Sequence, residues 1–172
     1  INGFTLKKKS LDARHGKVKV HLKYTVYTDK DFPEKSFGKN FLPEYKKADG
    51  TKNVIIVGSG PAGLFAALRL LEDGIKPIVV ERGNTAKERK RDIAQISRNH
   101  KINGDSNYCF GEGGAGTFSD GKLFTRSVKR GSPNRIYRLF HYFGAPKDII
   151  TASHPHIGSD LLPEIIHNMT CK

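Results

Sequence analysis

The sequence predicts an α/β fold in which a Rossmann-like parallel sheet follows an N-terminal β-containing appendage. Three observations predict it: an apolar β-branched run at 53–57, a glycine-rich turn leading into leucines at helical spacing, and a second apolar run at 77–81. Such runs are typical of parallel strands that are buried on both faces, and we expect both to be strands of that kind. Together they form a strand–helix–strand unit of about 30 residues, which is almost always right-handed.

The helix of this unit is marked at both ends. Pro61 suits its first turn, where a missing N–H costs nothing. Leu64, Leu68 and Leu71 then recur at helical spacing, and Gly74 is a natural stop.

The appendage precedes this unit. Apolar residues alternate with lysine, histidine and threonine from 18 to 26, which predicts a strand with one apolar and one basic face. A single strand cannot bury its face, so we expect it to pair. Residues 28–52 are polar and lack periodicity, and they are expected to be an irregular connection. We therefore divide the chain into an appendage and linker at 1–52 and a Rossmann-like domain at 53–172.

Further elements are expected after the second strand. Thr85 and Glu88 have the spacing of a capping box, so a basic helix should begin at Ala86. Asp120-Gly121 predicts a hairpin turn between 117–118 and 123–124. The remaining expectations are a helix opened by Ser132-Pro133, a short strand at 149–150, and a last helix from near Asp160.

The chain is strongly basic. Its 172 residues include 30 lysines and arginines against 17 aspartates and glutamates, which gives a formal net charge of +13. Such a charge suggests polyanionic partners, namely nucleic acid, an anionic membrane or phosphorylated small molecules. The basic residues are dispersed, however, so we favour a solvated surface or a piece of a longer, less basic protein.

The composition argues against a membrane-spanning protein, a disulfide-rich protein and a disordered chain. No uncharged apolar stretch approaches the ~20 residues that a membrane span requires. Cys109 and Cys171 are the two cysteines of the chain and cannot form a disulfide framework. Well-formed apolar runs argue against disorder. We expect a reducing, cytoplasmic setting.

A glycine fingerprint, Gly58-x-Gly60-x-x-Gly63, follows the first strand. Gly58 permits a tight turn, Gly60 lets a pyrophosphate approach the backbone, and Gly63 lets the helix pack near the sheet. The helix N-terminus offers N–H groups and a partial positive charge to phosphates. Glu81, about 20 residues further on, can accept hydrogen bonds from both ribose hydroxyls. The motif predicts a site for an adenine dinucleotide; the alternative is a glycine-rich turn in an unrelated α/β domain.

Two segments favour FAD as the dinucleotide. The stretch 57–64, with Pro61-Ala62 inside the motif, resembles the first dinucleotide site of glutathione-reductase-type flavoproteins, and so does Val80-Glu81-Arg82-Gly83. The stretches 107–126 and 154–158 resemble a bacterial family of largely uncharacterised FAD-dependent oxidoreductases.

This resemblance covers residues 9–172, and members of that family are considerably longer. It implies that the chain is an N-terminal portion whose parallel sheet and FAD site are incomplete. Gly158-Ser159-Asp160 is not counted as the family's late Gly-Asp motif, because it follows no apolar strand.

The predicted cofactor-binding residues lie in the fingerprint, at the end of the second strand, in the basic helix and in a dense glycine loop. They are Gly58, Gly60, Pro61, Ala62, Gly63, Glu81, Arg82, Arg89, Gly113, Gly114 and Gly116. The loop glycines could let backbone N–H groups approach a flavin or pyrophosphate, or they could form a flexible turn. Arg89 and Arg91 could reach phosphate oxygens or form a solvated face.

Other candidate residues have weaker patterns. Lys122 or Arg126 could place positive charge near a flavin, although surface positions are favoured. Cys109 is expected to be a small buried residue rather than a redox thiol. His154 and His156 lack further ligands nearby in sequence, so packing is favoured and no metal site is predicted.

The function predicted first is that of an FAD-binding oxidoreductase, with NAD(P)H as a possible electron donor and an unknown substrate. No catalytic residue can be named. One alternative is a flavin-dependent enzyme that modifies tRNA, which is disfavoured because no aromatic residues interleave the basic stretches. The other is a non-catalytic interaction module.

Overall fold

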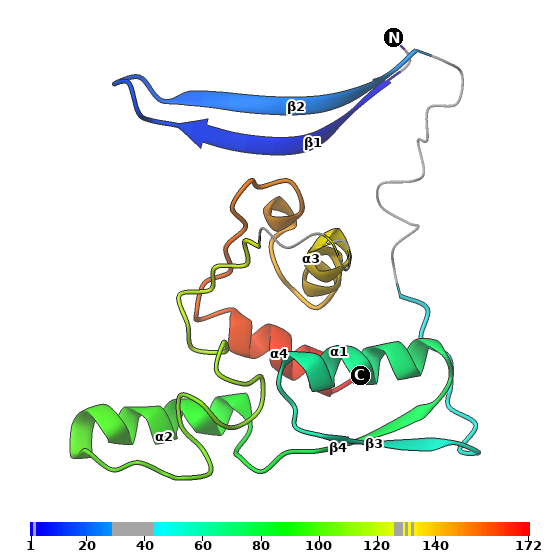
Figure 1. Cartoon of the computed structure of the whole chain (residues 1–172), viewed down its shortest axis with the longest axis vertical. Coiled ribbons are helices and arrows are strands. Elements are labelled where there is room, and N and C mark those ends of the chain that lie inside the picture. The colour runs from blue at the N-terminus through cyan, green and yellow to red at the C-terminus, as the bar shows by residue number, and fades with distance from the viewer. Residues whose placement is uncertain (2, 29–42, 126–128, 130, 132) are drawn as a thin grey trace. The chain divides into compact units, whose positions relative to one another are not determined.

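The computed structural model describes residues 1, 3–28, 43–125, 129, 131 and 133–172 (Figure 1). These residues form two compact units. One comprises the described residues of 1–42 and 122–157, and the other comprises 43–121 and 158–172. The domain boundary expected near residue 52 stays a prediction.

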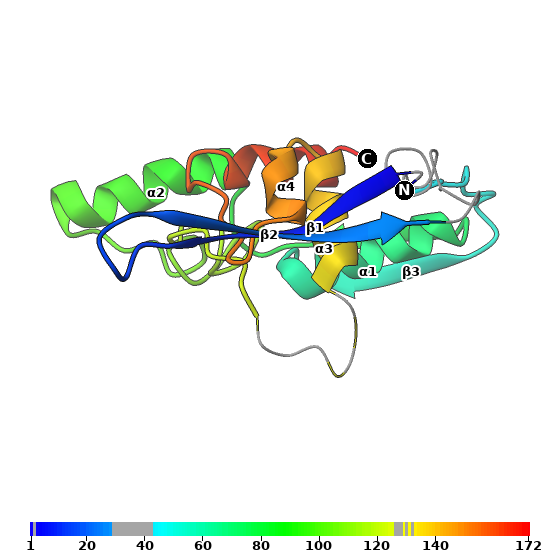
Figure 2. The ribbon, with the colours of Figure 1, turned by 90° about the horizontal axis from the view of Figure 1, so that it is seen from above.

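A β-hairpin forms the start of the first unit. Strands β1 (Gly3–Asp12) and β2 (Lys19–Tyr27) pair antiparallel and lie side by side in Figure 2. The strand expected at 18–26 is confirmed as β2, and its partner β1 was not predicted. The register shifts between Leu6 and Lys8, which marks a β-bulge. Because of it, Phe4, Leu6 and Leu11 all lie opposite apolar residues of β2.

The rest of the first unit is built around α3 (Pro133–Tyr142) and the short 3-10 helix η1 (Lys147–Ile150). The buried side chains of this part are Tyr137, Leu139, Phe143, Ala145, Ile149 and Ile157. The helix expected after Ser132-Pro133 is thus confirmed from Pro133, and Ser132 itself lies outside the described residues. The strand expected at 149–150 is wrong: a turn that begins at Pro146 closes with the Thr151 N–H donating to the Asp148 carbonyl (3.2 Å).

The second unit contains the predicted strand–helix–strand unit. Strands β3 (Asn53–Val57) and β4 (Lys76–Val80) pair in parallel, and α1 (Pro61–Glu72) connects them along one face (Figure 1). The expectation that both strands are buried on both faces is wrong, since Ile55 is 68% exposed and Val57 is 88% exposed. The reason is that, in the described part of the chain, this sheet has only these two strands.

Two further helices complete the second unit. They are α2 (Ala86–Asn99) and α4 (Leu162–Thr170), and both were expected from the sequence. Helix α4 packs against α1 and α2, and its buried residues Leu162, Ile165, Ile166 and Met169 form the core with Leu64, Ala67 and Leu68 of α1. Because α4 contacts both α1 and α2, this core holds the two helices in one unit.

The hairpin expected around Asp120-Gly121 is wrong. Lys122 bridges His156, and the Leu123 N–H donates to the Pro155 carbonyl (2.9 Å). Among the helices of the described residues, none is long and apolar enough to cross a membrane.

Candidate functional site

The turn between β3 and α1 is held against the end of β4. Gly58 has φ +97°, a left-handed conformation that favours glycine, and its N–H donates to the Val80 carbonyl (2.7 Å). A Cβ on Gly63 would overlap the carbonyl oxygen of Gly58, which is backbone and cannot move aside. Glycine at 63 therefore lets α1 begin directly against the turn, as the fingerprint predicted.

Among the described residues, no side chain caps the N-terminus of α1. Gly60 is the N-cap residue, no side-chain cap bonds the helix, and its first turn contains no acidic residue. Because Pro61 carries no N–H, the amides of Ala62 and Gly63 are the first donors of a helix end that is partially positive. A Cβ on Gly60 would make only an ordinary contact with the Cα of Gly114 at 3.9 Å, so the space in front of this residue is not filled.

Glu81 lies immediately after β4, beside this turn. Its Oε2 accepts hydrogen bonds from the Ser59 N–H (2.7 Å) and the Ser59 hydroxyl (3.1 Å), and its Oε1 accepts one from the Gly83 N–H (3.0 Å). Partial burial raises the pKa of Glu81, but the hydrogen bonds from Gly83 and Ser59 outweigh this and hold the pKa below its ordinary value. The group is therefore an ionised acceptor at neutral pH.

Arg82 is the next residue and points to the surface. Its Nε lies 3.1 Å from Asp105 Oδ1, and its guanidinium carbon lies 4.7 Å from the centre of the Phe110 ring. A Cβ on the following residue, Gly83, would meet the backbone of Asp105 and Gly111 at 2.5 Å. The end of β4 thus packs closely against the glycine loop, which we define as residues 107–117.

The glycine loop also meets the turn itself. The Gly113 N–H donates to the Ser59 carbonyl (2.8 Å), so Ser59 binds both the loop and Glu81. Gly114, with φ +72°, lies so close to the start of α1 that a Cβ would be 3.2 Å from Pro61 Cδ. The structure thereby brings the predicted Gly113 and Gly114 to the fingerprint, whereas Gly116 is exposed with open space around it.

Arg89 of α2 is completely buried beneath this loop, with 0% of its surface exposed. A solvated position for it is therefore excluded, while Arg91 is exposed. The Arg89 guanidinium donates to five loop carbonyls and to the Thr117 hydroxyl (3.2 Å). The carbonyls are those of Asn107 (2.8 Å), Tyr108 (3.4 Å), Gly111 (3.4 Å), Glu112 (2.5 Å) and Gly114 (3.0 Å).

Two residues of this arrangement were missed by the sequence reasoning. Glu112 is 6% exposed, and its Oε2 accepts a hydrogen bond from the Ala86 N–H (2.6 Å) at the start of α2. Thr117 is fully buried and donates to the Gly114 carbonyl (3.0 Å) while it accepts from Arg89. Neither has a local sequence signal, since their partners lie more than twenty residues away or are backbone atoms of the loop.

The other candidate residues are placed as follows. Cys109 is exposed, so the expectation of a buried residue is wrong. The reason is an Asx turn, in which its N–H donates to Asn107 Oδ1 (2.8 Å) and directs the chain outward. His154 and His156 are exposed in the first unit, and Arg126 lies outside the described residues. Among the described residues, no group of three or more His, Cys, Asp or Glu could hold a metal ion.

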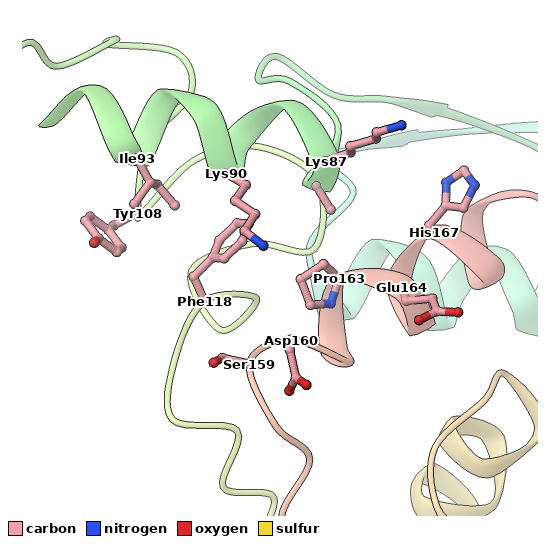
Figure 3. Close-up of a pocket in the computed structure, with 11 residues that line it drawn as sticks. Lys87, Lys90, Ile93, Tyr108, Phe118, Ser159, Asp160, Pro163, Glu164 and His167 are labelled. Carbon is pink, nitrogen blue, oxygen red and sulfur yellow. The ribbon is translucent and has the colours of Figure 1, made fainter. Parts of the chain in front are cut away.

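A cavity of about 520 Å³ lies beside α2 (Figure 3). Lys90 extends into it from α2 toward Phe118, and Asp160 and Glu164 project from the facing segment. Phe118 also contacts Arg89, whose guanidinium carbon lies 5.2 Å from the ring centre. Phe118 therefore lines the cavity on one side and contacts the buried arginine on the other. The sequence did not predict this cavity.

Comparison with known proteins supports the cofactor class. Residues 51–98, which contain β3, α1, β4 and most of α2, match a protein-family model described as FAD binding domain. An uncharacterised protein of Clostridium beijerinckii is 35% identical over 181 residues, a match that covers 98% of this chain and 34% of that protein. The chain therefore spans about a third of the length of this relative. An FAD-binding domain is present, and the resemblance to flavoproteins is confirmed at that level.

Proposed function

We propose that this chain carries the ADP-binding part of an FAD site in a flavoprotein oxidoreductase. The observation that carries the proposal is the position of Glu81, which accepts hydrogen bonds from Ser59 in the turn between β3 and α1, next to the uncapped N-terminus of α1. A carboxylate suited to accept from a ribose and a helix end suited to bind phosphate thus flank the same turn, which supports the proposal. The family match at residues 51–98 supports FAD as the dinucleotide.

The residues present fit the ADP part of the cofactor. A carboxylate has about four lone-pair sites, and three of those on Glu81 are taken by Ser59 and Gly83, so it can still accept from a ribose hydroxyl. The Ser59 hydroxyl can rotate to release a further site. At the helix, the amides of Ala62 and Gly63 would hold a phosphate oxygen, and glycine at 60 lets that oxygen approach.

The flavin, when bound, would supply the redox chemistry, because it accepts and returns hydride or electrons. The role of this chain's own residues is to bind and orient the ADP end and to exclude side chains from the diphosphate. The catalytic residues, the substrate and the electron donor belong to the whole protein and are not assigned; NAD(P)H stays one candidate donor.

The test is FAD binding by this chain, measured as quenching of flavin fluorescence. We expect saturable binding, and for Glu81→Gln we expect the Kd to rise at least tenfold, which is about 1.4 kcal/mol. Glu44→Gln is the matched control, because Glu44 is exposed and lies outside the site. Absence of binding by the unaltered chain, or equal Kd values for the two variants, would contradict the proposal.

A further inference from the structure

Arg89 is a buried cation, and all the hydrogen bonds described for its side chain go to the glycine loop. Each hydrogen bond described for its guanidinium ends on an oxygen of the glycine loop, 18 to 28 residues further along the chain. Burial lowers the pKa of Arg89, which reflects the cost of removing the guanidinium from water. A charge that is costly to bury and binds only this loop determines the conformation of the loop.

The direction of the loop peptides follows from these bonds. In a trans peptide, the C=O and the following N–H point to opposite sides. Since the carbonyls of Glu112 and Gly114 point at Arg89, the amides of Gly113 and Ala115 point away from it. The Gly113 amide is bonded to Ser59 of the phosphate-binding turn, and Ala115 is exposed.

The same loop lies against the start of α1. Gly114 is in contact with Pro61 and Gly60, two residues of the turn that is expected to hold the diphosphate. Any rearrangement of the loop at 113–115 would therefore change both the hydrogen bond to Ser59 and the space in front of α1.

We propose that Arg89 is a positioning residue of the dinucleotide site, which holds the glycine loop so that the outward-facing Ala115 amide and the N-terminus of α1 bind the diphosphate together. This proposal rests on the function proposed above. It differs from a direct contact between Arg89 and phosphate, because Arg89 acts from beneath the loop and has no exposed surface.

The experiment compares Arg89→Met with Arg91→Met. Both variants remove one arginine charge from α2, but only Arg89 is buried. Binding of ADP and of adenosine is measured by isothermal titration or by NMR shifts, and hydrogen exchange of the loop amides at 107–117 is measured without ligand.

We expect Arg89→Met to raise the Kd for ADP about thirtyfold and to speed exchange of the loop amides at least tenfold, because several charge-assisted hydrogen bonds are lost. The Kd for adenosine should change less than threefold, since the ribose acceptor Glu81 is bonded to Ser59 and Gly83 and not to Arg89. Arg91→Met should leave all three measurements within twofold.

Two results would overturn the proposal. Equal weakening of ADP and adenosine would show that Arg89 supports the fold in general, and unchanged ADP binding would show that the loop is not part of the site. Failure of the unaltered chain to bind ADP at all would instead overturn the proposed function.

Thr117→Val keeps the proposal testable if Arg89→Met does not fold. It removes one oxygen of the same network and leaves the buried charge and the side-chain shape in place. We expect a rise in the Kd for ADP of about threefold to tenfold with adenosine binding unchanged. Weakened adenosine binding, or no change in ADP binding, would count against the proposal.

Discussion

The N-termini of α1 and α2 lie in the same unit, but in the described part of the chain side chains cap only that of α2. Helix α2 begins at Thr85, whose hydroxyl accepts from the Glu88 N–H while Glu88 bonds back to the Thr85 N–H, and Glu112 accepts from the Ala86 N–H. Helix α1 has Gly60 as its N-cap residue, with no side-chain cap and no acid in its first turn. One helix end is neutralised by two carboxylates of the protein, whereas the other keeps its partial charge.

This difference shows that the partial positive charge of a helix N-terminus can serve either the stability of the fold or the binding of a ligand. Capping a helix with a protein carboxylate adds stability to the fold, about 1 kcal/mol for each cap. Leaving the end uncapped forgoes that stability and provides a site for an external anion.

Gly63→Ala should have the largest effect. Its Cβ would overlap the Gly58 carbonyl, so α1 would have to move away from the turn, at a cost of about 3 kcal/mol in the free energy of unfolding. Urea denaturation measures this. Gly116→Ala is the matched control, because nothing lies within 4 Å of its added Cβ, and it should change stability by less than about 0.5 kcal/mol. Similar losses in the two variants would contradict the close approach at 63.

Gly60→Asp should make the start of α1 resemble that of α2. Gly60 has φ −70° and ψ −177°, which any residue can adopt, so the carboxylate can cap the helix. We expect the free energy of unfolding to rise by about 1 kcal/mol. The Kd for ADP should rise about a hundredfold, or about 2.7 kcal/mol, because the new carboxylate takes the place of the phosphate.

Gly60→Ala separates the charge from the added volume in this test. It adds a Cβ without a cap and should weaken ADP binding less than tenfold. If the aspartate and alanine variants bound ADP equally well, the helix end would not be an anion site.

Glu112→Gln should weaken the start of α2. The buried carboxylate is replaced by a neutral amide, and the charge-assisted bond from Ala86 becomes an ordinary one, at a cost of about 2 kcal/mol in the free energy of unfolding. Thermal or urea unfolding measures the loss. Glu44→Gln, at an exposed position, should cost less than about 0.5 kcal/mol, and an equal cost would refute the role of Glu112.

Thr85→Ala should cost about 1 kcal/mol, since it removes the hydroxyl of the capping box. Thr85→Ser keeps the hydroxyl and should recover most of that stability. A serine variant as unstable as the alanine variant would show that the methyl group of Thr85, and not its hydroxyl, supports α2.

The smallest effect is a pH dependence from Glu81. Its pKa is lower in the folded than in the unfolded protein, so its stabilisation is fully present above the unfolded value of about 4.3 and is lost as the pH falls through the folded pKa. The difference in unfolding free energy between the unaltered chain and Glu81→Gln should therefore be constant near pH 7 and shrink below about pH 4.3. A difference that grew with acidification would have the wrong sign.

Local signals explain which parts of the molecule could be predicted. The unit of β3, α1 and β4, the role of Gly63 and the capping box of Thr85 are each encoded within one short stretch of sequence. Glu81 could be assigned to the turn because parallel strands end at the same edge of a sheet.

The missed features depend on residues that are distant in sequence. Arg89 belongs to a helix with several basic residues, and only the folded loop shows that the acceptors of Arg89 are backbone carbonyls. The hairpin expected at 120–121 failed because residues 122 and 123 pair with 155 and 156, which are more than thirty positions away. Burial of Ile55 and Val57 depends on neighbouring strands, which a local pattern cannot supply.

The bulge between Leu6 and Lys8 means that side-chain orientation along β1 does not follow one odd–even rule. Leu6 and Leu11 are five positions apart, an odd number, yet both lie opposite residues of a single face of β2. Without Lys7 the two leucines would be four positions apart, and regular alternation alone would place both on that face. In a substitution scan of β1, even-numbered positions before the bulge therefore correspond to odd-numbered positions after it.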